Sequence, residues 1–386
     1  MVSVLLVERI PLTLLNSTNP GVVDMCKLLT ERGHEVVALT MKNSENQEGI
    51  VETVTVPFHF QRQRYLHKIL ASVGFSILAP LYAAHIAKCR KVDILCYNDV
   101  VPIFWQIAWS FFRNVKKVHF EGDFISEYIS KNGLGRFIYN PLYQVEKWHW
   151  NQFDIVAVTS KAFMRLLLTN GVPAKQVRIL PESVDTHLFK AEPKRESKGV
   201  SPFTIVTHGI LTHYKGAEIL LYALKKVIDE GYRVHLNIIG DGPEKPSLER
   251  LIRKLDIEKE VSMLGWVSLA QVANLMSDAR LGVVLRRKSI ANDLVLTQAL
   301  LQYACLRVPI LAPDTASIRE EMKHGESVLI YRAGNAEDLA DKVIFALENN
   351  VLLEKLAENA FQIVTARHSR EITAEEAVRI CLSLVQ

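Results

Sequence analysis

Residues 204–243 read TIVTHGILTHYKGAEILLYALKKVIDEGYRVHLNIIGDGP, and this stretch holds a strand, a loop, a helix and a second strand in that order. The apolar runs 204–207 and 235–239 are long enough for strands and too short for helices. Residues 217–230 lie between them and repeat their apolar side chains every three or four positions, as an amphipathic helix does. This order of elements predicts parallel strands covered by helices.

The same order of elements recurs at the start of the chain. Residues 3–7 form a short apolar run, residues 22–32 have helical spacing, and residues 34–40 form a second apolar run. Further runs of strand length occur at 94–97, 117–120, 155–159, 261–264, 281–285 and 309–312, and further helices are predicted at 247–255, 270–279 and 295–303. We therefore expect the α/β class, with two doubly wound, Rossmann-like domains that face a cleft.

The length of 386 residues is typical of about two domains. The segment 190–199 is charged and contains Pro and Gly, which is typical of a linker. We expect one domain over residues 1–190 and a second over residues 200–364. A C-terminal helix of about 365–386 is expected to pack back on the first domain.

The composition excludes several classes of protein. Hydrophobic residues make up 49% and charged residues 23%, which excludes a disordered chain. The net charge of +4 is smaller than the excess typical of nucleic-acid-binding proteins, so no nucleic-acid partner is expected. The five cysteines include no C-x-x-C pair, which argues against a disulfide scaffold and favours a cytoplasmic compartment. Residues 1–15 have no basic segment before their apolar run, so no secretory signal is expected.

Positive charge is concentrated in one N-terminal stretch. Residues 62–117 hold nine basic and two acidic side chains, a net charge of +7. The same stretch contains the uncharged run 69–87 and the aromatic-rich run 103–112. Aromatic and basic residues together favour contact with an anionic membrane surface, which predicts a peripheral protein on the inner face of the membrane. The alternative is an ordinary buried helix with solvated ends.

Five segments resemble, in order and spacing, motifs of the retaining GT-B glycosyltransferases, glycosyltransferase family 4 in particular. The segments are 153–162 (like A-D-x-V-x-A-V-S-x-A), 183–189 (like G-V-D-x-x-x-F), 208–216 (like G-R-L-x-x-x-K-G), 238–243 (like I-V-G-D-G-P) and 261–267 (like V-x-F-L-G-x-V). One such motif is a weak signal, whereas five in register between about residues 150 and 350 are a strong one.

The resemblance implies a function as well as a GT-B fold. Such an enzyme transfers a sugar, with retention, from a nucleotide diphosphate sugar to a glycan or lipid-linked acceptor, in cell-surface polysaccharide or glycolipid synthesis. It needs no metal and no cofactor. The first domain would then be the acceptor side, and the second would bind the nucleotide sugar.

The loop 208–216 carries the main candidate for catalysis. Lys215 follows a strand and Gly216 opens a helix, so the ammonium and the helix N-terminus could together offset the charge of a diphosphate leaving group. The alternative is a solvated loop lysine. Gly209 belongs to the same motif, and Ile210 stands where the family usually has Arg, which removes one cation.

A second glycine-rich turn follows the strand 235–239. Gly240 and Gly242 permit left-handed backbone and are expected to bring the chain close to the donor. Asp241 lies between them and is either a donor contact or a turn residue that caps the next helix.

The family's pair of glutamates, E-x7-E, is absent from this chain. Alignment on residues 302–312 places Gln302 at the second glutamate, where an amide could hold the ribose hydroxyls, and Leu294 at the first. Asp293 is a substitute for the first glutamate or a turn residue. Thr297, at a predicted helix start, would present backbone N–H groups to phosphate.

The N-terminal half resembles the family more weakly. Gly21 remains from the family's glycine-rich loop and is assigned to the acceptor side. His119 matches the family's histidine, and Glu121 and Asp123 are the nearby acids. His119 or Glu121 is expected to contact the donor sugar, and Asp123 the acceptor side. The alternative for His119 is a strand residue that points into the core.

Two other functions stay open at this point. A noncatalytic GT-B protein that binds a nucleotide or glycan would explain the missing arginine and glutamates. A nucleotide-sugar epimerase of similar fold agrees less well with the motifs.

Overall fold

The computed structural model describes residues 1–8, 20–43, 51–60, 65–98, 104–122, 124, 126–127, 135–190 and 202–385. These residues form two compact units, which are described separately. Unit 1 combines Met1–Ser183 with Arg370–Gln386, and unit 2 is Val184–Ser369. Unit 2 therefore starts several residues before the predicted boundary. The predicted linker lies, apart from Lys190, outside the described residues.

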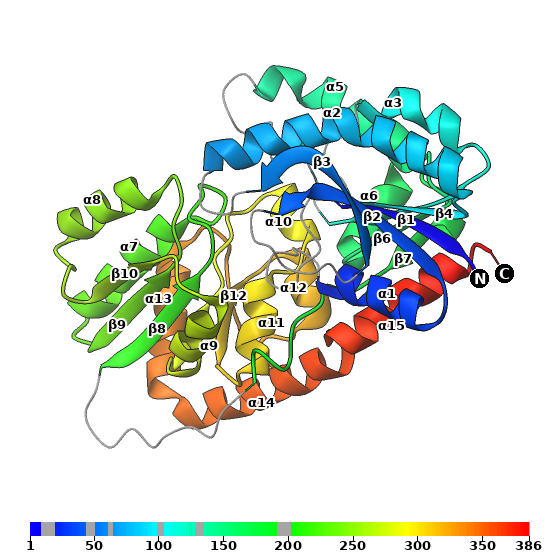
Figure 1. Ribbon diagram of the computed structural model, residues 1–386. Coiled ribbons are helices and arrows are strands. Elements are labelled where there is room, and N and C mark those ends of the chain that lie inside the picture. The colour runs from blue at the N-terminus through cyan, green and yellow to red at the C-terminus, as the bar shows by residue number, and fades with distance from the viewer. Residues whose placement is uncertain are drawn as a thin grey trace. The chain divides into compact units, whose positions relative to one another are not determined.

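Unit 1 is built on a seven-stranded sheet in the order β3-β2-β1-β4-β5-β6-β7, and every strand pair is parallel (Figure 1). The strands are β1 (Ser3–Glu8), β2 (Glu35–Asn43), β3 (Glu52–Phe60), β4 (Ile94–Asn98), β5 (Lys116–Glu121), β6 (Ile155–Val158) and β7 (Val177–Ile179). The central strands β1, β4 and β6 are buried along almost their whole length, because helices cover both faces of the sheet.

The helices of unit 1 include the last helix of the chain. They are α1 (Pro20–Glu31), α2 (Tyr65–Arg90), α3 (Trp105–Ala108), α5 (Gly135–Trp150), α6 (Lys161–Thr169) and α15 (Arg370–Leu382), with short 3-10 turns at Trp109–Phe112 and Ala174–Gln176. Figure 1 shows α15 (red) running beside α1. Arg370 donates two hydrogen bonds, of 2.6 and 2.7 Å, to the carboxylate of Asp24, which fixes the start of α15 against α1.

Unit 2 has a six-stranded parallel sheet in the order β10-β9-β8-β11-β12-β13. Its strands are β8 (Phe203–His208), β9 (Val234–Ile239), β10 (Val261–Gly265), β11 (Leu281–Val283), β12 (Ile310–Pro313) and β13 (Leu329–Tyr331). The strand order reverses between β8 and β11. Ligands of doubly wound sheets bind at the carboxyl ends of strands at such a reversal.

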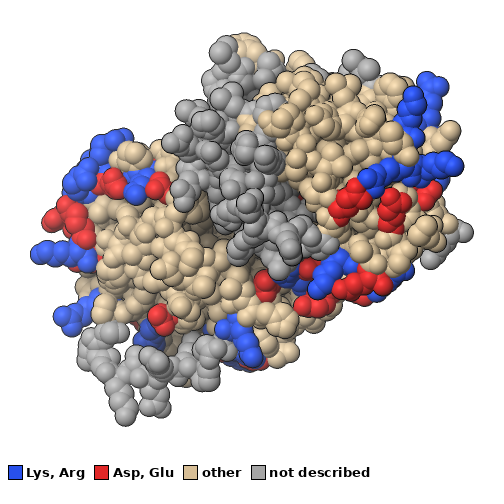
Figure 2. Space-filling view, viewed as in Figure 1, with Lys and Arg blue, Asp and Glu red and all other residues tan. Residues whose placement is uncertain are grey.

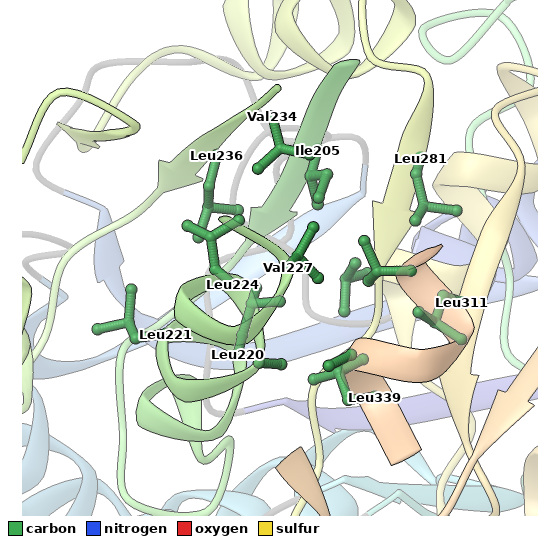
Figure 3. Packing of buried hydrophobic residues seen from close by; sticks show 14 of the residues in the cluster. Ile205, Leu220, Leu221, Leu224, Val227, Val234, Leu236, Leu281, Leu311 and Leu339 are labelled. Atoms are coloured by element: carbon green, nitrogen blue, oxygen red, sulfur yellow. The ribbon is translucent and has the colours of Figure 1, made fainter. Parts of the chain in front are cut away.

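The helices of unit 2 pack on both faces of this sheet. They are α7 (Ala217–Asp229), α8 (Lys245–Leu255), α9 (Leu269–Ser277), α10 (Ile290–Leu294), α11 (Gln298–Cys305), α12 (Ala316–Glu321), α13 (Ala336–Glu348) and α14 (Asn350–Arg367). Figure 3 shows Leu224 and Val227 of α7 near Leu236 and Ile205 of the sheet, and Leu220 on the side of α7 toward Leu339. The predicted apolar face of residues 217–230 is therefore the buried one.

The helix predicted over residues 295–303 is wrong at its start. Val295 is extended (φ −111°, ψ 126°) and separates α10 from α11. Thr297 caps α11 by accepting a hydrogen bond from the backbone N–H of Leu300 at 3.3 Å. The apolar side chains at 294–296 mimic helical spacing, but the N-cap at Thr297 decides where the helix begins.

Candidate functional site

The loops that follow β8 and β9 in unit 2 pack against each other through their backbones. The N–H of Leu211 donates to the carbonyl of Asp241 at 2.9 Å. A Cβ atom on Gly240 (φ 135°) would lie 2.2 Å from the carbonyl oxygen of Gly209, and one on Gly242 would lie 2.4 Å from that of Leu211. The two glycines thus admit the neighbouring loop, a structural requirement that explains both without any ligand.

Lys215 folds back beneath the first of these loops. Its Nζ donates to the carbonyl oxygen of His208 at 3.1 Å, and a Cβ on Gly209 would lie only 2.2 Å from that Nζ. Gly209 therefore makes room for the ammonium. Burial, and secondly the charge of Arg286, lower the pKa of Lys215 to about 7. Within the described ranges, no acidic side chain forms an ion pair with Lys215.

His208 and Gln302 lie beside this lysine. His208 Nδ1 lies 3.4 Å from the Tyr303 hydroxyl. Burial, and secondly the charge of Lys215, lower the pKa of His208 to about 3, while the adjacent Gln302 opposes this shift. The Oε1 of Gln302 is buried and has no hydrogen-bond partner in the described part of the chain. A free, buried acceptor next to a cation is a fitting contact for a ligand hydroxyl.

Tyr303 holds the neighbouring Gln302 close to the end of β8. Its hydroxyl donates to the carbonyl oxygen of Val206 at 3.2 Å, and its ring fills the space above Gly282. A Cβ on Gly282 would lie 2.6 Å from that ring. Helix α11 is therefore fixed against β8 and β11, with Gln302 next to His208.

The other three predicted donor contacts already make bonds within unit 2. Asp241 accepts from the N–H of Gly242 at 2.7 Å and lies 3.4 Å from Lys245, as a turn residue would. Asp293 accepts from the N–H of Ala316 at 3.3 Å and so joins α10 to α12, and burial raises its pKa. Thr297 is the N-cap of α11. These hydrogen bonds give each residue a structural role that does not require a bound nucleotide sugar.

Sequence reasoning missed Arg286, which follows β11. The Nε of Arg286 is buried and makes no hydrogen bond to any described residue. Its neighbour Arg287 is paired with Glu218 and donates to the carbonyl oxygen of His213 at 2.9 Å. The available signal was the run Arg286-Arg287-Lys288 directly after an apolar strand, because ligands of such sheets bind at strand ends.

In unit 1, the structure places His119 in the interior, as the alternative interpretation predicts. Only 3% of the residue is exposed. Its Nε2 lies 2.8 Å from the Glu121 carboxylate, its Nδ1 lies 3.1 Å from the carbonyl oxygen of Tyr97, and its ring stacks on Phe153. Glu121 also accepts a hydrogen bond from Trp150 at 2.6 Å. The two residues therefore satisfy each other inside an aromatic cluster.

The remaining predicted residues of unit 1 contribute less. Gly21 lies in the first turn of α1, where its N–H donates to the Ser183 hydroxyl at 3.0 Å. Asp123 lies outside the described residues. Nowhere in the described ranges do three His, Cys, Asp or Glu side chains gather as metal ligands would.

Two family models match consecutive parts of the chain. Residues 20–188 match the model for Glycosyltransferase Family 4, and residues 189–363 match the model for Glycosyl transferases group 1. Two curated relatives differ in how much of this chain they match. N-acetyl-alpha-D-glucosaminyl L-malate synthase of Bacillus anthracis is 24% identical over 89% of this chain and 88% of the relative. Alpha-D-kanosaminyltransferase of Streptomyces kanamyceticus is 25% identical over 58% of this chain, which spans only 59% of that protein.

Solved structures share the fold. Anabaena Alr3699/HepE, solved in complex with UDP and with UDP-glucose, superposes with a TM-score of 0.74 and 17% identity, over 99% of this chain and 100% of that one. A glycosyltransferase from Rickettsia africae ESF-5 also gives a TM-score of 0.74, with 15% identity over 100% of this chain and 99% of that one.

Proposed function

The chain belongs to the GT-B glycosyltransferases of the family 4 type, and from that premise we propose that it moves a sugar with retention from a nucleotide diphosphate sugar to a hydroxyl of a glycan or lipid-linked acceptor. The observation that supports this most directly is Lys215. It is a half-buried cation with no acidic partner among the described residues, at the carboxyl end of β8, where the strand order reverses.

The role proposed for Lys215 is to stabilise the leaving diphosphate. As the bond between the sugar C1 and the phosphate oxygen breaks, negative charge grows on the diphosphate, and a fixed cation lowers the energy of that state. The approach of a diphosphate also raises the pKa of Lys215 above its value in the free protein, so the lysine is protonated when the nucleotide is bound.

Retention follows if the acceptor oxygen attacks C1 from the face that the diphosphate leaves. The acceptor proton then passes to a phosphate oxygen of the leaving group, and no protein base is needed. Gln302, through its unpaired Oε1, is proposed to accept a hydrogen bond from a ribose hydroxyl. Contact of His119 or Glu121 with the donor sugar stays a prediction.

A membrane-bound acceptor is supported by one face of α2. Val73, Ile77 and Leu81 recur every four residues along this helix and are 41%, 44% and 66% exposed. Figure 2 shows mostly uncharged side chains on this part of unit 1, with basic and acidic side chains next to each other at the right-hand edge of the view. No helix in the described part of the chain has the length and apolar character needed to cross a bilayer. We propose that this face rests on an anionic membrane surface.

Vesicle sedimentation tests this membrane contact. The wild type should sediment with vesicles that contain anionic lipid. The double variant Ile77→Ser with Leu81→Ser should stay in the supernatant, because it lacks the most exposed apolar side chains of the face. Val351→Ser, at an 84% exposed position of unit 2, is the matched control and should sediment as the wild type does. Equal sedimentation of all three proteins would contradict the proposed contact.

A thermal-shift panel of nucleotide diphosphate sugars tests the transfer reaction, beginning with UDP-sugars because a structural neighbour binds UDP-glucose. We expect one donor to raise the melting temperature. NMR of the product formed from that donor should then show the anomeric configuration of the donor. An inverted product would refute retention, and specific binding without turnover on any acceptor would favour a noncatalytic protein.

A further inference from the structure

We propose that Arg286 supplies a second positive charge to the diphosphate site of Lys215, an inference that rests on the proposed function. A nucleoside diphosphate carries at least two negative charges, and one lysine matches only part of that charge. The position next to Gly209 does not supply the other cation, because Ile210 stands there with 38% of its surface exposed.

The end of β11 holds Arg286 against the loop of Lys215. The backbone N–H of Arg287 donates to the carbonyl oxygen of Tyr214 at 3.0 Å, which joins the neighbours of the two cations directly. On the other side, the Tyr331 hydroxyl donates to the carbonyl oxygen of Val284 at 3.0 Å. The backbone around Arg286 is therefore fixed from both sides.

The charges around the two cations are unbalanced. Arg287 is neutralised by Glu218, the acid in the first turn of α7. Arg286 has no ion pair with any described acid, and its Nε is buried without a hydrogen-bond partner. Its charge is near enough to Lys215 to lower that lysine's pKa. Two unpaired cations held together are unfavourable unless an anion binds between them.

The chemistry of the two side chains suits phosphate oxygens. A guanidinium presents a planar fork of N–H donors that can bind two oxygens at once, while the ammonium acts as a point charge. Arg286 is therefore proposed to contact the phosphates and not the base or the sugar. Its loss should weaken the binding of a nucleoside diphosphate more than that of the corresponding monophosphate.

Calorimetric titration of the full chain with UDP, and separately with GDP, tests this role. Arg286→Ala should weaken the binding of whichever nucleotide binds by roughly ten- to a hundredfold. Arg286→Lys should restore part of the affinity, because it keeps the charge and loses the fork. The control Arg253→Ala removes an equal charge from an exposed position of α8 and should stay within about twofold of wild type.

Thermal unfolding separates a binding role from a structural one. If Arg286 is held in place without partners, Arg286→Ala should be at least as stable as wild type in the absence of nucleotide, because a repulsion is relieved. A lower melting temperature together with unchanged nucleotide affinity would make Arg286 a structural residue and overturn the inference.

The titrations also distinguish this inference from the function on which it rests. If the wild type binds neither UDP nor GDP, the proposed function and the role of Arg286 fall together. If the wild type binds UDP or GDP and Arg286→Ala binds it equally well, only the role of Arg286 is overturned. Equal losses in Arg286→Ala and Arg253→Ala would also overturn it, since a general charge effect would then suffice.

Discussion

The carboxyl ends of β5 in unit 1 and of β8 in unit 2 both carry polar residues that resemble a glycosyltransferase site, and they differ in how those residues are satisfied. At β5, His119 and Glu121 bond to each other, to Tyr97 and to Trp150. At β8, by contrast, Lys215 lacks an acidic partner among the described residues, and Gln302 keeps a buried acceptor unused.

The difference is between polar residues whose hydrogen bonds are made within the chain and polar residues that are free to bind a ligand. A buried polar group without a partner destabilises the folded chain, so an unpaired group is the more informative one. In unit 2, Arg286 and Gln302 carry such groups near Lys215. In unit 1, both ring nitrogens of His149, which packs against His119, are also buried without a hydrogen-bond partner among the described residues. We therefore expect nucleotide binding at the end of β8, whereas the pair at the end of β5 already has partners within unit 1.

The largest effect is expected for Lys215→Ala. Loss of the cation that stabilises the leaving diphosphate should lower kcat by about 10²- to 10³-fold. The measurement is the initial rate of nucleoside diphosphate release with the donor found in the thermal-shift panel. Lys254→Ala, an exposed lysine of α8, should keep the wild-type rate. An unchanged rate in Lys215→Ala would remove the proposed catalytic role of this lysine.

Gly240→Ala should have the next largest effect, and this effect is a loss of stability. The added Cβ would meet the carbonyl oxygen of Gly209 and would also require an unfavourable positive φ. We expect a loss of about 2–4 kcal/mol in the free energy of unfolding, measured by denaturant titration. Gly231→Ala, where φ is also positive but no atom lies within 4 Å, should lose only about 1 kcal/mol. Equal losses would contradict the close packing of the two loops.

The pH dependence of nucleotide binding should show the protonation of Lys215. In the free protein its pKa is about 7, and a bound diphosphate raises it, so binding above pH 7 takes up a proton. The affinity for UDP or GDP should therefore fall by about tenfold between pH 7 and pH 8.5. Lys215→Arg keeps its charge over this range and should give a nearly flat profile. A flat profile in the wild type would mean that Lys215 does not contact the phosphates.

His119→Phe should have the smallest effect on nucleotide binding. The ring would remain among Tyr97 and Phe153, but the Glu121 carboxylate would lose one of its donors. We expect the free energy of unfolding to fall by about 1–3 kcal/mol while the nucleotide Kd changes by less than about twofold. A large rise in Kd with unchanged stability would show that the end of β5 belongs to the binding site after all.

Local sequence patterns were enough to predict the fold class and most of the strands. Short apolar runs alternating with helical spacing predicted parallel sheets, and β8, α7 and β9 lie within one or two residues of their predicted bounds. The start of α11 was wrong, because the apolar side chains at 294–296 continue a helical pattern that the backbone does not follow. The strands β3, β7 and β13 were not predicted.

The site was harder to predict because its geometry depends on residues far apart in the sequence. The need for glycine at position 240 comes from Gly209, 31 residues earlier, and the partners of His119 come from β4 and α5. Arg286 was missed because its significance comes from the Lys215 loop, to which only the folded chain connects it. Motif matching found the position of Lys215 but gave no means of telling satisfied polar residues from unsatisfied ones.

Amide hydrogen exchange on the full chain, with UDP and then with GDP, tests the central claim most directly. We expect the nucleotide that binds to slow exchange in residues 208–216 and 285–288 of unit 2. Residues 116–121 of unit 1 should exchange as they do in the free protein. Slowed exchange confined to residues 116–121, with no change in the two segments of unit 2, would contradict it.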